Sequence, residues 1–339
     1  MTEAQVIAVD LDGTLTLTDT LHECALTLVR NKPYILLLLP FWLFKGIAHL
    51  KQKVAEHSEL DVTTLPYNQP FIDWLKEEKL RGKKIVLSTA ANEKIAKQVV
   101  KNFNFFDEFI ASDSTTNLKS ARKRKALQER YGVEGYDYAG NSNDDLEVWA
   151  GASNAIVVNA SESVASRAST LTSISQIFRS ERAGFPIWFK ALRVHQWLKN
   201  LLLFVPLLAA HQISNVQSLS SLVIAFVSFS LCASSAYITN DLLDLESDRS
   251  HPRKRFRPFA SAKLSVLHGV IAAPLLIVAS FLLGAVVGVD FLFVLIIYLF
   301  LTVTYSFSLK RLVLVDCLTL ATLYTMRIIA GAAAVSVSL

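Results

Sequence analysis

Cysteine is scarce in this chain, with 3 cysteines in 339 residues. Cys24, Cys232 and Cys317 lie far apart, and their spacing matches neither a metal-binding nor a redox motif. We therefore expect all three to be packing residues. The opening residues, MTEAQVIAVD, lack the basic stretch and apolar run of a secretory signal, so we expect no cleaved signal peptide.

Charged residues are rare in the apolar runs that begin at about residue 185, whereas residues 1 to about 180 read as a soluble α/β domain. The apolar fraction of 52% and the mean hydropathy of +0.37 are high for a soluble protein. We expect an all-α bundle of about five membrane-spanning helices. Their expected limits are roughly 200–212, 218–239, 265–287, 291–309 and 312–336.

Lys and Arg are missing from two of the loops between these runs, HQISNVQ and VVGVD, and are present in the others. This alternation predicts a multi-pass protein of the inner or plasma membrane with its basic loops and N-terminal domain in the cytoplasm. We interpret the net charge of +5 as favouring the binding of anionic headgroups and phosphorylated ligands. We expect no nucleic-acid partner. The basic stretch KSARKRK, residues 119–125, is equally consistent with a solvated helix face.

Polar side chains end three predicted strands of the N-terminal half. Asp10 and Asp12 follow VIAV, and their spacing points both carboxylates the same way. A carboxylate pair, a hydroxyl, a lysine and a second acidic cluster, each after a strand, suit Mg²⁺-assisted phosphoryl transfer. The later members of this set are Ser88 and Thr89 after KKIVL, Lys119, Lys123 and Lys125 on a basic helix, and Asn141, Asp144 and Asp145 after YDYAG.

In this order the motifs resemble those of the haloacid dehalogenase-like phosphohydrolase superfamily. The resemblance implies a Rossmann-like α/β domain over residues 1–178 with a small helical cap at about 16–80. It also implies roles for five residues: Asp10 as nucleophile and metal ligand, Asp12 as general acid/base, Thr89 as phosphate-binding hydroxyl, Lys123 beside the phosphorylated aspartate, and Asp145 as Mg²⁺ ligand. Asn141 stands where the family has an acidic residue. A domain that keeps the fold but has no phosphatase activity remains an alternative.

Between the first two motifs lies NKPYILLLLPFWLFKGIAHLKQKVAEH. Its apolar part, Tyr34 to Phe44, is too short to span a bilayer. We expect a helical cap whose apolar face meets the membrane or a neighbouring domain. Burial of that face against its own domain is the alternative.

The stretch NDLLDLESDRSHPRKRFRPFAS, residues 240–261, follows an apolar run directly. On a helix, Asp241, Asp244 and Asp248 share one face and repel one another unless a cation lies among them. Such oxygen ligands suit Mg²⁺, and the arginines that follow can contact phosphate oxygens. We therefore expect a diphosphate–Mg²⁺ site, with an acidic helix end followed by a positive-inside loop as the alternative.

NDxxDxxxDR resembles the first aspartate-rich motif of the UbiA superfamily of prenyltransferases. LRVHQWLKNLLLFVPL, DRSHPRKRFRPFAS and YSFSLKRLVLVDCLTLATLYTMRIIAGA are most similar to its decaprenyl-phosphate phosphoribosyltransferase branch. The resemblance implies transfer of 5-phosphoribose from phosphoribosyl diphosphate to a polyprenyl phosphate in the bilayer, by residues 199–339 after a linker at 179–198. Two alternatives stay open, a prenyl diphosphate donor with an aromatic acceptor, and a non-catalytic anchor for a phosphatase.

On this resemblance the three aspartates hold the Mg²⁺-diphosphate. The other implied site residues are Asn240, Arg257 and Lys310 for the phosphates, Tyr305 at the mouth of the site, and His195 and Lys199 near the acceptor phosphate or the ribose. Asp316 and Arg327 are ionisable groups within a predicted span, 11 residues apart, so we expect each to face a cavity or a partner. The superfamily has nine spans and the sequence ends after the fifth, at GAAAVSVSL, so we expect a fragment or a truncated product.

Overall fold

The computed structural model describes residues 5–113, 116–179, 184–211, 214–307 and 313–335. The chain divides into two compact units. The N-terminal unit is Met1–Arg182, with Arg249–Arg255 grouped to it, and the C-terminal unit is Ala183–Asp248 with Phe256–Leu339.

A parallel sheet of six strands forms the centre of the N-terminal unit, in the order β3-β2-β1-β4-β5-β6. The central strands are almost entirely buried, because helices cover both faces of the sheet. The strands are β1 (Val6–Val9), β2 (Lys84–Asn92), β3 (Glu108–Ser112), β4 (Asp137–Gly140), β5 (Asn154–Val158) and β6 (Ser173–Phe178).

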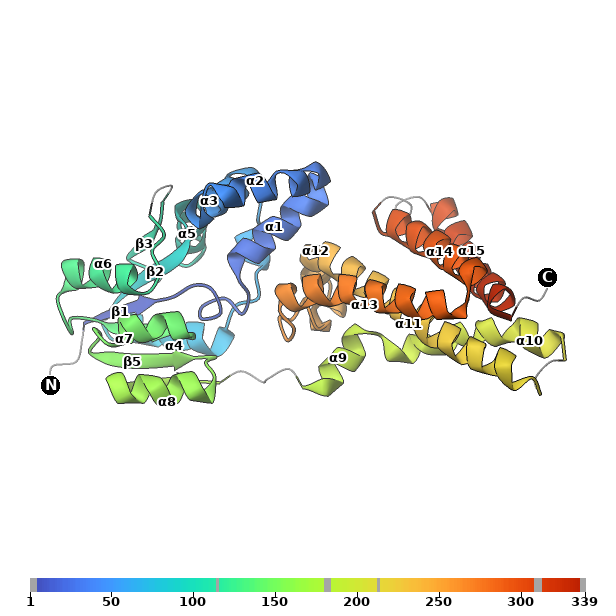
Figure 1. Ribbon diagram of the computed structural model, residues 1–339. Helices are drawn as coiled ribbons and strands as arrows, with labels where there is room; N and C mark the ends of the chain where they lie inside the picture. The colour runs from blue at the N-terminus through green and yellow to red at the C-terminus, as the bar shows by residue number, and fades with distance from the viewer. Residues whose placement is uncertain (1–4, 114–115, 180–183, 212–213, 308–312, 336–339) are drawn as a thin grey trace. The chain divides into compact units, whose positions relative to one another are not determined.

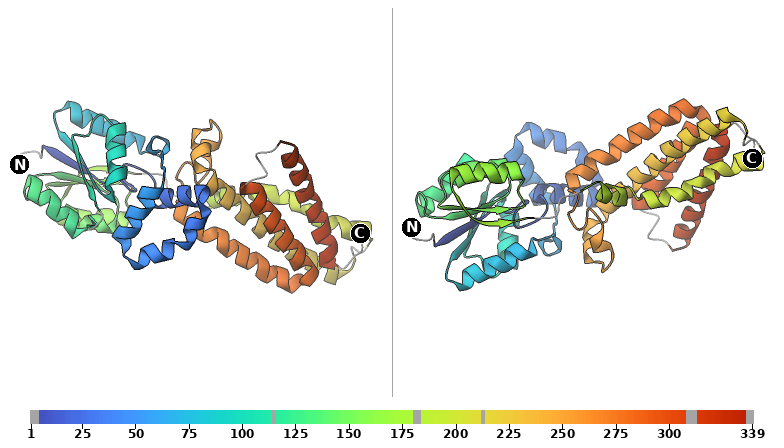
Figure 2. Two further views of the ribbon diagram at one scale, coloured as in Figure 1. Left: turned by 90° about the horizontal axis from the view of Figure 1, so that it is seen from above. Right: turned by 90° about the horizontal axis from the view of Figure 1, so that it is seen from below.

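Helices pack on the two faces of this sheet (Figures 1 and 2). Along β1, Ile7 and Val9 belong to one apolar cluster and Ala8 to another, as the two-residue period of a strand requires. Helices α4 (Gln69–Leu80) and α5 (Glu93–Asn102) bury their apolar residues in the first cluster. Helices α6 (Ala121–Tyr131), α7 (Leu146–Trp149) and α8 (Glu162–Leu171) contribute to the second. The unit is therefore a three-layer α/β fold.

The chain between β1 and α4 forms a small helical cap. Asp19 is the N-cap of its first helix, where its carboxylate accepts hydrogen bonds from the backbone N–H groups of Leu21 and His22. The cap consists of α1 (Thr20–Asn31), the 3₁₀ helix η1 (Pro33–Leu37), α2 (Leu39–Phe44), α3 (Ile47–His57) and the 3₁₀ helix η2 (Val62–Thr64).

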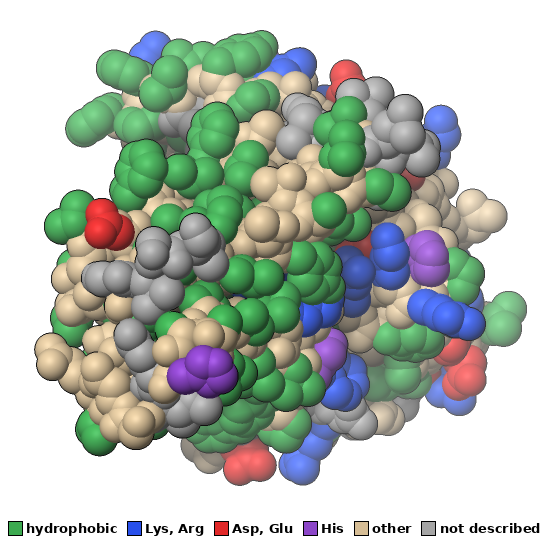
Figure 3. Space-filling view, turned by 90° about the vertical axis from the view of Figure 1, so that its right-hand side faces the viewer, with side chains coloured by type: hydrophobic (Ala, Val, Ile, Leu, Met, Phe, Trp, Pro, Cys, Tyr) green, Lys and Arg blue, Asp and Glu red, His purple; other side chains and the backbone are tan. Residues whose placement is uncertain are grey.

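The C-terminal unit is all-helical. Its elements are α9 (Phe185–Ala191), the 3₁₀ helix η4 (Val194–Phe204), α10 (Val205–Ala209), α11 (Val216–Leu243), α12 (Leu245–Ser250), the 3₁₀ turn η5 (Lys254–Phe256), α13 (Val266–Val287), α14 (Val289–Phe307) and α15 (Val313–Val335). Hydrophobic side chains cover much of the face drawn in Figure 3. Large apolar side chains are exposed along α11, α13, α14 and α15, among them Val223, Leu275, Phe300 and Leu318. An apolar solvent such as a bilayer suits this exposure.

The predicted architecture, an α/β domain followed by a membrane helix bundle, is confirmed. The expected number of spans is corrected, because four helices among the described residues are long and apolar enough to cross a membrane. The predicted first span, 200–212, instead falls on η4 and α10, and the apolar helix from Val194 to Ala209 is shorter than a span. Pro206, which has no backbone N–H, stands at the start of α10, where a proline is tolerated.

Close packing of α15 against η4 depends on a glycine. A Cβ at Gly331 would lie 2.0 Å from the backbone oxygen of Leu203, and backbone cannot move aside cheaply. At Gly284 of α13 the nearest atoms are leucine side-chain carbons 3.3 Å away, which can adjust.

Gly331→Ala should therefore destabilise the C-terminal unit by roughly 1–3 kcal/mol, the usual cost of overpacking. Gly284→Ala is the matched control, and it should be neutral or stabilising because alanine is the better helix former. Thermal unfolding of the full chain in detergent measures both. Equal melting temperatures for the two variants would contradict the packing of α15 on η4.

Candidate functional sites

The first candidate site lies at the carboxyl ends of β1 and β4 in the N-terminal unit. The strand order reverses between these two neighbouring strands, and ligands bind at such a switch point in open parallel sheets. Asp10 and Asp12 follow β1, and Asp145 lies in the 3₁₀ turn η3 (Asn143–Asp145) after β4. The sheet thus brings together carboxylates that are 135 residues apart in the sequence, from Asp10 to Asp145.

Lys123, on α6, is the cation of this site. Its Nζ donates to Asp10 Oδ1 at 2.7 Å and to the hydroxyl of Tyr138 at 2.9 Å. The Tyr138 hydroxyl in turn donates to Asp145 Oδ1 at 2.7 Å. Lys123 is buried, whereas the side chains of Lys119 and Lys125 are more than half exposed and pair with other acids.

Asp145 is fixed by the turn around it. Its Oδ2 accepts from the backbone N–H of Asn141 at 3.0 Å and from the backbone N–H and hydroxyl of Ser142, both at 2.9 Å. The Asn141 side chain reaches the loop after β1, where a Cβ on Gly13 would lie 2.1 Å from its Nδ2. Gly13 also has φ of +75°, so this position needs glycine on both grounds.

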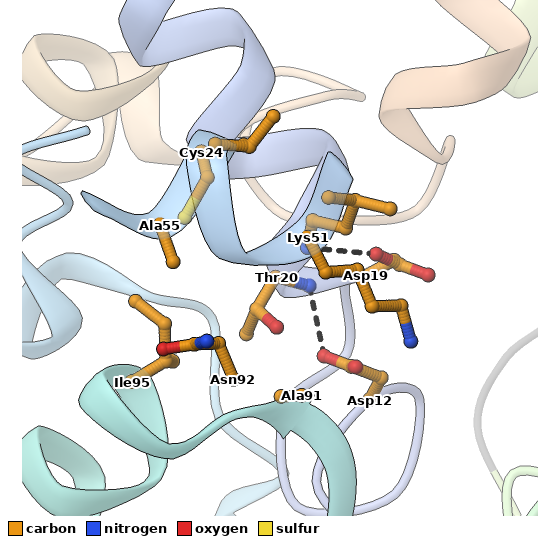
Figure 4. A pocket seen from close by; sticks show the side chains of 11 residues that line it. Asp12, Asp19, Thr20, Cys24, Lys51, Ala55, Ala91, Asn92 and Ile95 are labelled. Carbon is orange, nitrogen blue, oxygen red and sulfur yellow. Dashed lines mark hydrogen bonds between the residues drawn. The ribbon is translucent and has the colours of Figure 1, made fainter. Parts of the chain in front are cut away.

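Asp12 faces a cavity that opens between the cap and the sheet (Figure 4). Its Oδ1 accepts from the backbone N–H of Thr20 at 2.8 Å. The cavity has a volume of about 340 Å³, counting space open to solvent. Lys51 of α3 lines it and donates to the backbone oxygen of Ala90 at 2.9 Å, and burial lowers the pKa of this lysine. A polar group from the cap therefore shares this cavity with Asp12.

The two aspartates after β1 have raised pKa values. Burial raises the pKa of Asp10 from 3.8 to about 6, although Lys123 opposes the shift. Burial, together with the charge of Asp19, raises the pKa of Asp12 from 3.8 to about 7. The pKa of Lys123 is also raised, because the attraction of Asp10 and Asp145 outweighs its burial. Near pH 7 Asp10 is mostly ionised and Asp12 is divided between its two forms, which suits a nucleophile beside an acid/base group.

Thr89 lies on β2, the other neighbour of β1 in the sheet. It is fully buried, and its Oγ1 accepts from the backbone N–H of Ala91 at 2.9 Å. Ser88, the residue before Thr89, and Thr14, in the loop after β1, have buried hydroxyls without a hydrogen-bond partner among the described residues. The strand ends thus hold hydroxyl groups with hydrogen-bonding capacity to spare.

The second candidate site lies at the carboxyl end of α11 in the C-terminal unit. Arg257 joins two buried carboxylates, since its Nη1 lies 3.1 Å from Asp241 Oδ1 and 2.7 Å from Asp248 Oδ2. Arg193 pairs with Asp241 as well, and its guanidinium lies 4.8 Å from the centre of the Tyr237 ring. Two guanidinium groups and two carboxylates therefore meet at one place.

Asp244 ends α11, and α12 begins at the next residue. The backbone hydrogen bonds from Asp244 to Asn240 and from Asp248 to Asp244 keep the helical spacing across this break. Of the other predicted site residues, Asp244, Asn240 and Tyr305 are half-buried, His195 and Lys199 are exposed, and Lys310 lies outside the described residues. The Lys199 ammonium lies 5.8 Å from the centre of the Tyr324 ring.

Arg327 is a buried cation within α15. Its Nε donates to Asn200 Oδ1 at 2.9 Å, and Asn200 donates to Ser230 Oγ at 2.8 Å. The guanidinium also lies 5.2–5.6 Å from the ring centres of Tyr324, Tyr298 and Phe229. These contacts join α15, η4 and α11, so this intramembrane charge has partners from neighbouring helices. The side chain of Asp316 lies outside the described residues.

Three residues of these sites did not emerge from the sequence. In the sequence, Tyr138 resembles any other residue of a buried strand. Its contact with Lys123 depends on the position of β4 in the sheet. Arg193 contributed only to the predicted charge of its loop. Its position in LRVHQWLKN, one of the motifs behind the resemblance, could have indicated a site residue. Asn200, in the same stretch, could be recognised only once α15 was seen to pack on η4.

Magnesium is the metal expected at both sites. Among the described residues, no group of three or more His, Cys, Asp or Glu side chains gathers closely enough to hold a metal ion. Asp10 is paired with Lys123, and Asp241 and Asp248 are paired with Arg257. The donor type fits a hard dication. Magnesium therefore stays a proposal for both sites.

Residues 201–339 match the UbiA prenyltransferase family. A Sinorhizobium fredii protein, uncharacterized protein y4nM, is 36% identical over 327 residues, which are 95% of this chain and 62% of that protein. Decaprenyl-phosphate phosphoribosyltransferase of Mycobacterium tuberculosis is 36% identical over 154 residues, which are 44% of this chain and 51% of that enzyme. The chain thus spans about half to three fifths of the length of these curated relatives.

Solved structures that align with about half of the chain include a Bordetella pertussis protein of unknown function, at 16% identity and a TM-score of 0.41, covering 51% of this chain and 97% of that one. Another is phosphoserine phosphatase in its apo form, at 16% identity and a TM-score of 0.37, covering 52% of this chain and 93% of that one. The C-terminal unit contains a UbiA prenyltransferase family domain. This match and the four apolar helices indicate a multi-pass membrane protein.

The raised pKa of Asp12 predicts a pH-dependent stability of the metal-free N-terminal unit. Asp12 ionises near pH 3.8 in the unfolded chain but holds its proton to about pH 7 in the folded chain. Between these values the folded state binds more protons, so stability falls as the pH rises from about 4 to about 7 and then levels off. Asp12→Asn should therefore leave the melting temperature unchanged at pH 4 and raise it at pH 8.

Calorimetric scans of the full chain with a chelator test this expectation, and Asp144→Asn, at a more exposed carboxylate, is the control. A melting-temperature difference for Asp12→Asn that does not vary with pH would contradict it.

Proposed function

We propose that the C-terminal unit transfers 5-phosphoribose from phosphoribosyl diphosphate to a polyprenyl phosphate, with magnesium, and that the N-terminal unit is a phosphatase on the cytoplasmic side of the inner or plasma membrane. The family match and the homologous decaprenyl-phosphate phosphoribosyltransferases support the transferase class. The observation that carries the proposal is the cluster of Arg193 and Arg257 with Asp241 and Asp248.

This cluster has the groups that a Mg²⁺-diphosphate needs. In the resting chain each arginine neutralises a buried carboxylate, so neither charge is stranded. A bound diphosphate offers the guanidinium groups phosphate oxygens in bidentate geometry. Asp241, Asp244 and Asp248 would then be available to hold Mg²⁺, which supplies charge neutralisation of the diphosphate leaving group.

The other predicted residues have supporting roles in this proposal. Asn240 and Lys310 would contact the donor phosphates, and Tyr305 would line the site. His195 and Lys199 would lie near the acceptor phosphate or the ribose. The positions of His195 and Lys199 on η4 and of Tyr305 near the end of α14 agree with such roles.

In the N-terminal unit, Asp10 would attack the phosphorus of a phosphate monoester. A bond forms between an Asp10 carboxylate oxygen and phosphorus while the ester P–O bond breaks, and Asp12 gives its proton to the leaving oxygen. Water then attacks the aspartyl-phosphate and Asp12 takes its proton, which releases inorganic phosphate and restores both residues. Lys123 and Thr89 would bind the transferring phosphoryl group, and Asp10 with Asp145 would hold Mg²⁺.

The two activities have a chemical reason to share a chain. The transferase product would be a polyprenyl-phosphoryl ribose that still carries its 5-phosphate. A phosphatase tethered to the transferase meets this product at a raised effective concentration. The family match itself favours one second candidate, transfer of a prenyl group from prenyl diphosphate to an aromatic acceptor.

The transferase proposal predicts that label from ribose-labelled phosphoribosyl diphosphate enters the lipid phase when the full chain, Mg²⁺ and polyprenyl phosphate are present. Asp241→Asn should reduce this transfer by on the order of 10²-fold, because a charge that stabilises the leaving group is lost. Asp10→Asn, in the other unit, should leave it intact. Transfer of a prenyl group from prenyl diphosphate, with none from the phosphoribosyl donor, would contradict the proposal and favour the second candidate.

The phosphatase proposal predicts Mg²⁺-dependent release of phosphate from the 5-phosphorylated lipid. Asp10→Asn should abolish release, and Asp12→Asn should slow it by on the order of 10²-fold, the usual effect of losing a general acid. Lys125→Met, which changes an exposed lysine two residues from Lys123, is the matched control and should keep full activity. Phosphate release that survives Asp10→Asn would rule out the aspartyl-phosphate route.

A further inference from the structure

The cap of the N-terminal unit carries an exposed apolar surface. Between Tyr34 of η1 and Ile47, the first residue of α3, seven large hydrophobic side chains are 41–89% exposed. We refer to them as the cap patch: Tyr34, Leu37, Leu38, Phe41, Leu43, Phe44 and Ile47. The segment lies on the helical cap, away from the strands (Figure 1).

The concentration of these residues sets the cap patch apart. The described part of the N-terminal unit has eleven exposed large hydrophobic residues, and seven of them lie in these fourteen positions. The other four, Leu80, Val133, Leu171 and Ile177, are scattered singly through the unit, as is normal for a soluble surface. A contiguous patch instead marks a surface with a partner.

The inner side of the same segment is anchored. Ile35 is 2% exposed, and Leu39 and Trp42 pack against the main apolar cluster of the unit. Pro33 and Pro40 stand in the first turns of η1 and α2, where proline favours the helical start. The outward side chains are therefore presented by a folded, amphipathic element.

Charge identifies the partner. From residue 24 to residue 55 the sequence has five Lys or Arg and no Asp or Glu. Arg30 and Lys45 are exposed and Lys32 is half-buried. Arg30 and Lys32 precede the patch in the sequence, and Lys45 lies within it between Phe44 and Ile47. A hydrophobic face edged by cations fits a surface that is apolar beneath an anionic layer, which is the arrangement of a bilayer with acidic headgroups.

We propose that the cap patch inserts into the headgroup region of an anionic bilayer, with its apolar side chains in the acyl boundary and its cations on lipid phosphates. The segment is too short to span the membrane, so it would lie in the interface. The four candidate spans of the same chain keep a bilayer within reach. This proposal does not depend on the phosphatase or transferase activities.

Membrane insertion would act on the neighbouring pocket. The patch continues through Gly46, at φ of +103°, into α3, and α3 carries Lys51 into the cavity that Asp12 faces. If the cap lies in the membrane interface, the cavity lined by Asp12 and Lys51 lies close to the lipid headgroups. This consequence, unlike insertion itself, rests on the proposed phosphatase activity: the surface favours a substrate whose phosphate is attached to a membrane lipid.

The test uses the full chain with Cys24, Cys232 and Cys317 replaced by alanine, reconstituted in nanodiscs that contain nitroxide-labelled lipid. A fluorophore is attached at Phe44→Cys, and the matched control is the same label at Leu80→Cys. These positions are 89% and 88% exposed and belong to the same unit, so labelling disturbs neither core. In nanodiscs with phosphatidylglycerol the label at position 44 should be quenched by the lipid and the label at position 80 should not.

A second set of variants tests the contribution of the cations. Replacing Lys32 and Lys45 by Gln should lower the ratio of lipid-inserted to free cap by about fivefold per lysine, the equivalent of about 1 kcal/mol per charge near an anionic surface. Nanodiscs of phosphatidylcholine alone, which carry no net negative charge, should also reduce insertion of the cap patch. Equal quenching at positions 44 and 80 would overturn the proposal. So would a blue-shifted but unquenched label at position 44, because the patch would then be covered by protein, either a second copy or another part of the chain.

Discussion

A buried charge needs an opposite charge in the same low-dielectric surroundings, and both units are arranged around this constraint. In the N-terminal unit, Lys123 lies against Asp10 and is linked to Asp145 through Tyr138. In the C-terminal unit, Arg257 joins Asp241 and Asp248. Removing one partner from such a group strands the other, which costs several kcal/mol, so each cluster holds together the elements that contribute to it.

In the proposed functions, the same pairing leaves both places ready for phosphate. A cation that neutralises carboxylates in the resting chain can contact phosphate oxygens when a ligand enters, and the released carboxylates can accept a dication. Arg327 differs, because amide and aromatic partners satisfy it and no carboxylate contact is found among its described neighbours. Its contacts agree with a structural role that fixes α15 against η4 and α11.

Much of the fold could be predicted from the sequence because its signals are local. The run VIAV before Asp10 and the long apolar runs from residue 216 onward correspond to β1 and to four long helices. The predicted first span was wrong because hydropathy does not register backbone geometry, and η4 adopts the tighter 3₁₀ form before Pro206. Strands β3, β5 and β6 were not identified, since their short sequences, such as EFIAS, carry little pattern of their own.

The candidate sites were predictable where a motif places residues at a strand or helix end, as for Asp10, Asp12 and Asp241. The partners were harder to predict. Arg193 meets Asp241 from 48 positions away, and Tyr138 meets Lys123 because of sheet register, neither of which a local pattern encodes. In the cap, one side of the apolar segment packs on its own domain, as the alternative expected, and the other side is exposed. Contact of the exposed side with a membrane or a neighbouring domain stays a prediction.

The central claim is that the arginine–aspartate cluster of the C-terminal unit is a binding site for a Mg²⁺-diphosphate. Calorimetric titration of phosphoribosyl diphosphate into the full chain in nanodiscs tests it without requiring turnover or an acceptor lipid. Binding should require Mg²⁺ and should weaken by at least about tenfold in Asp248→Asn, because a carboxylate proposed to hold the metal becomes a neutral amide. Binding of equal strength with a chelator present, or in Asp248→Asn, would contradict it.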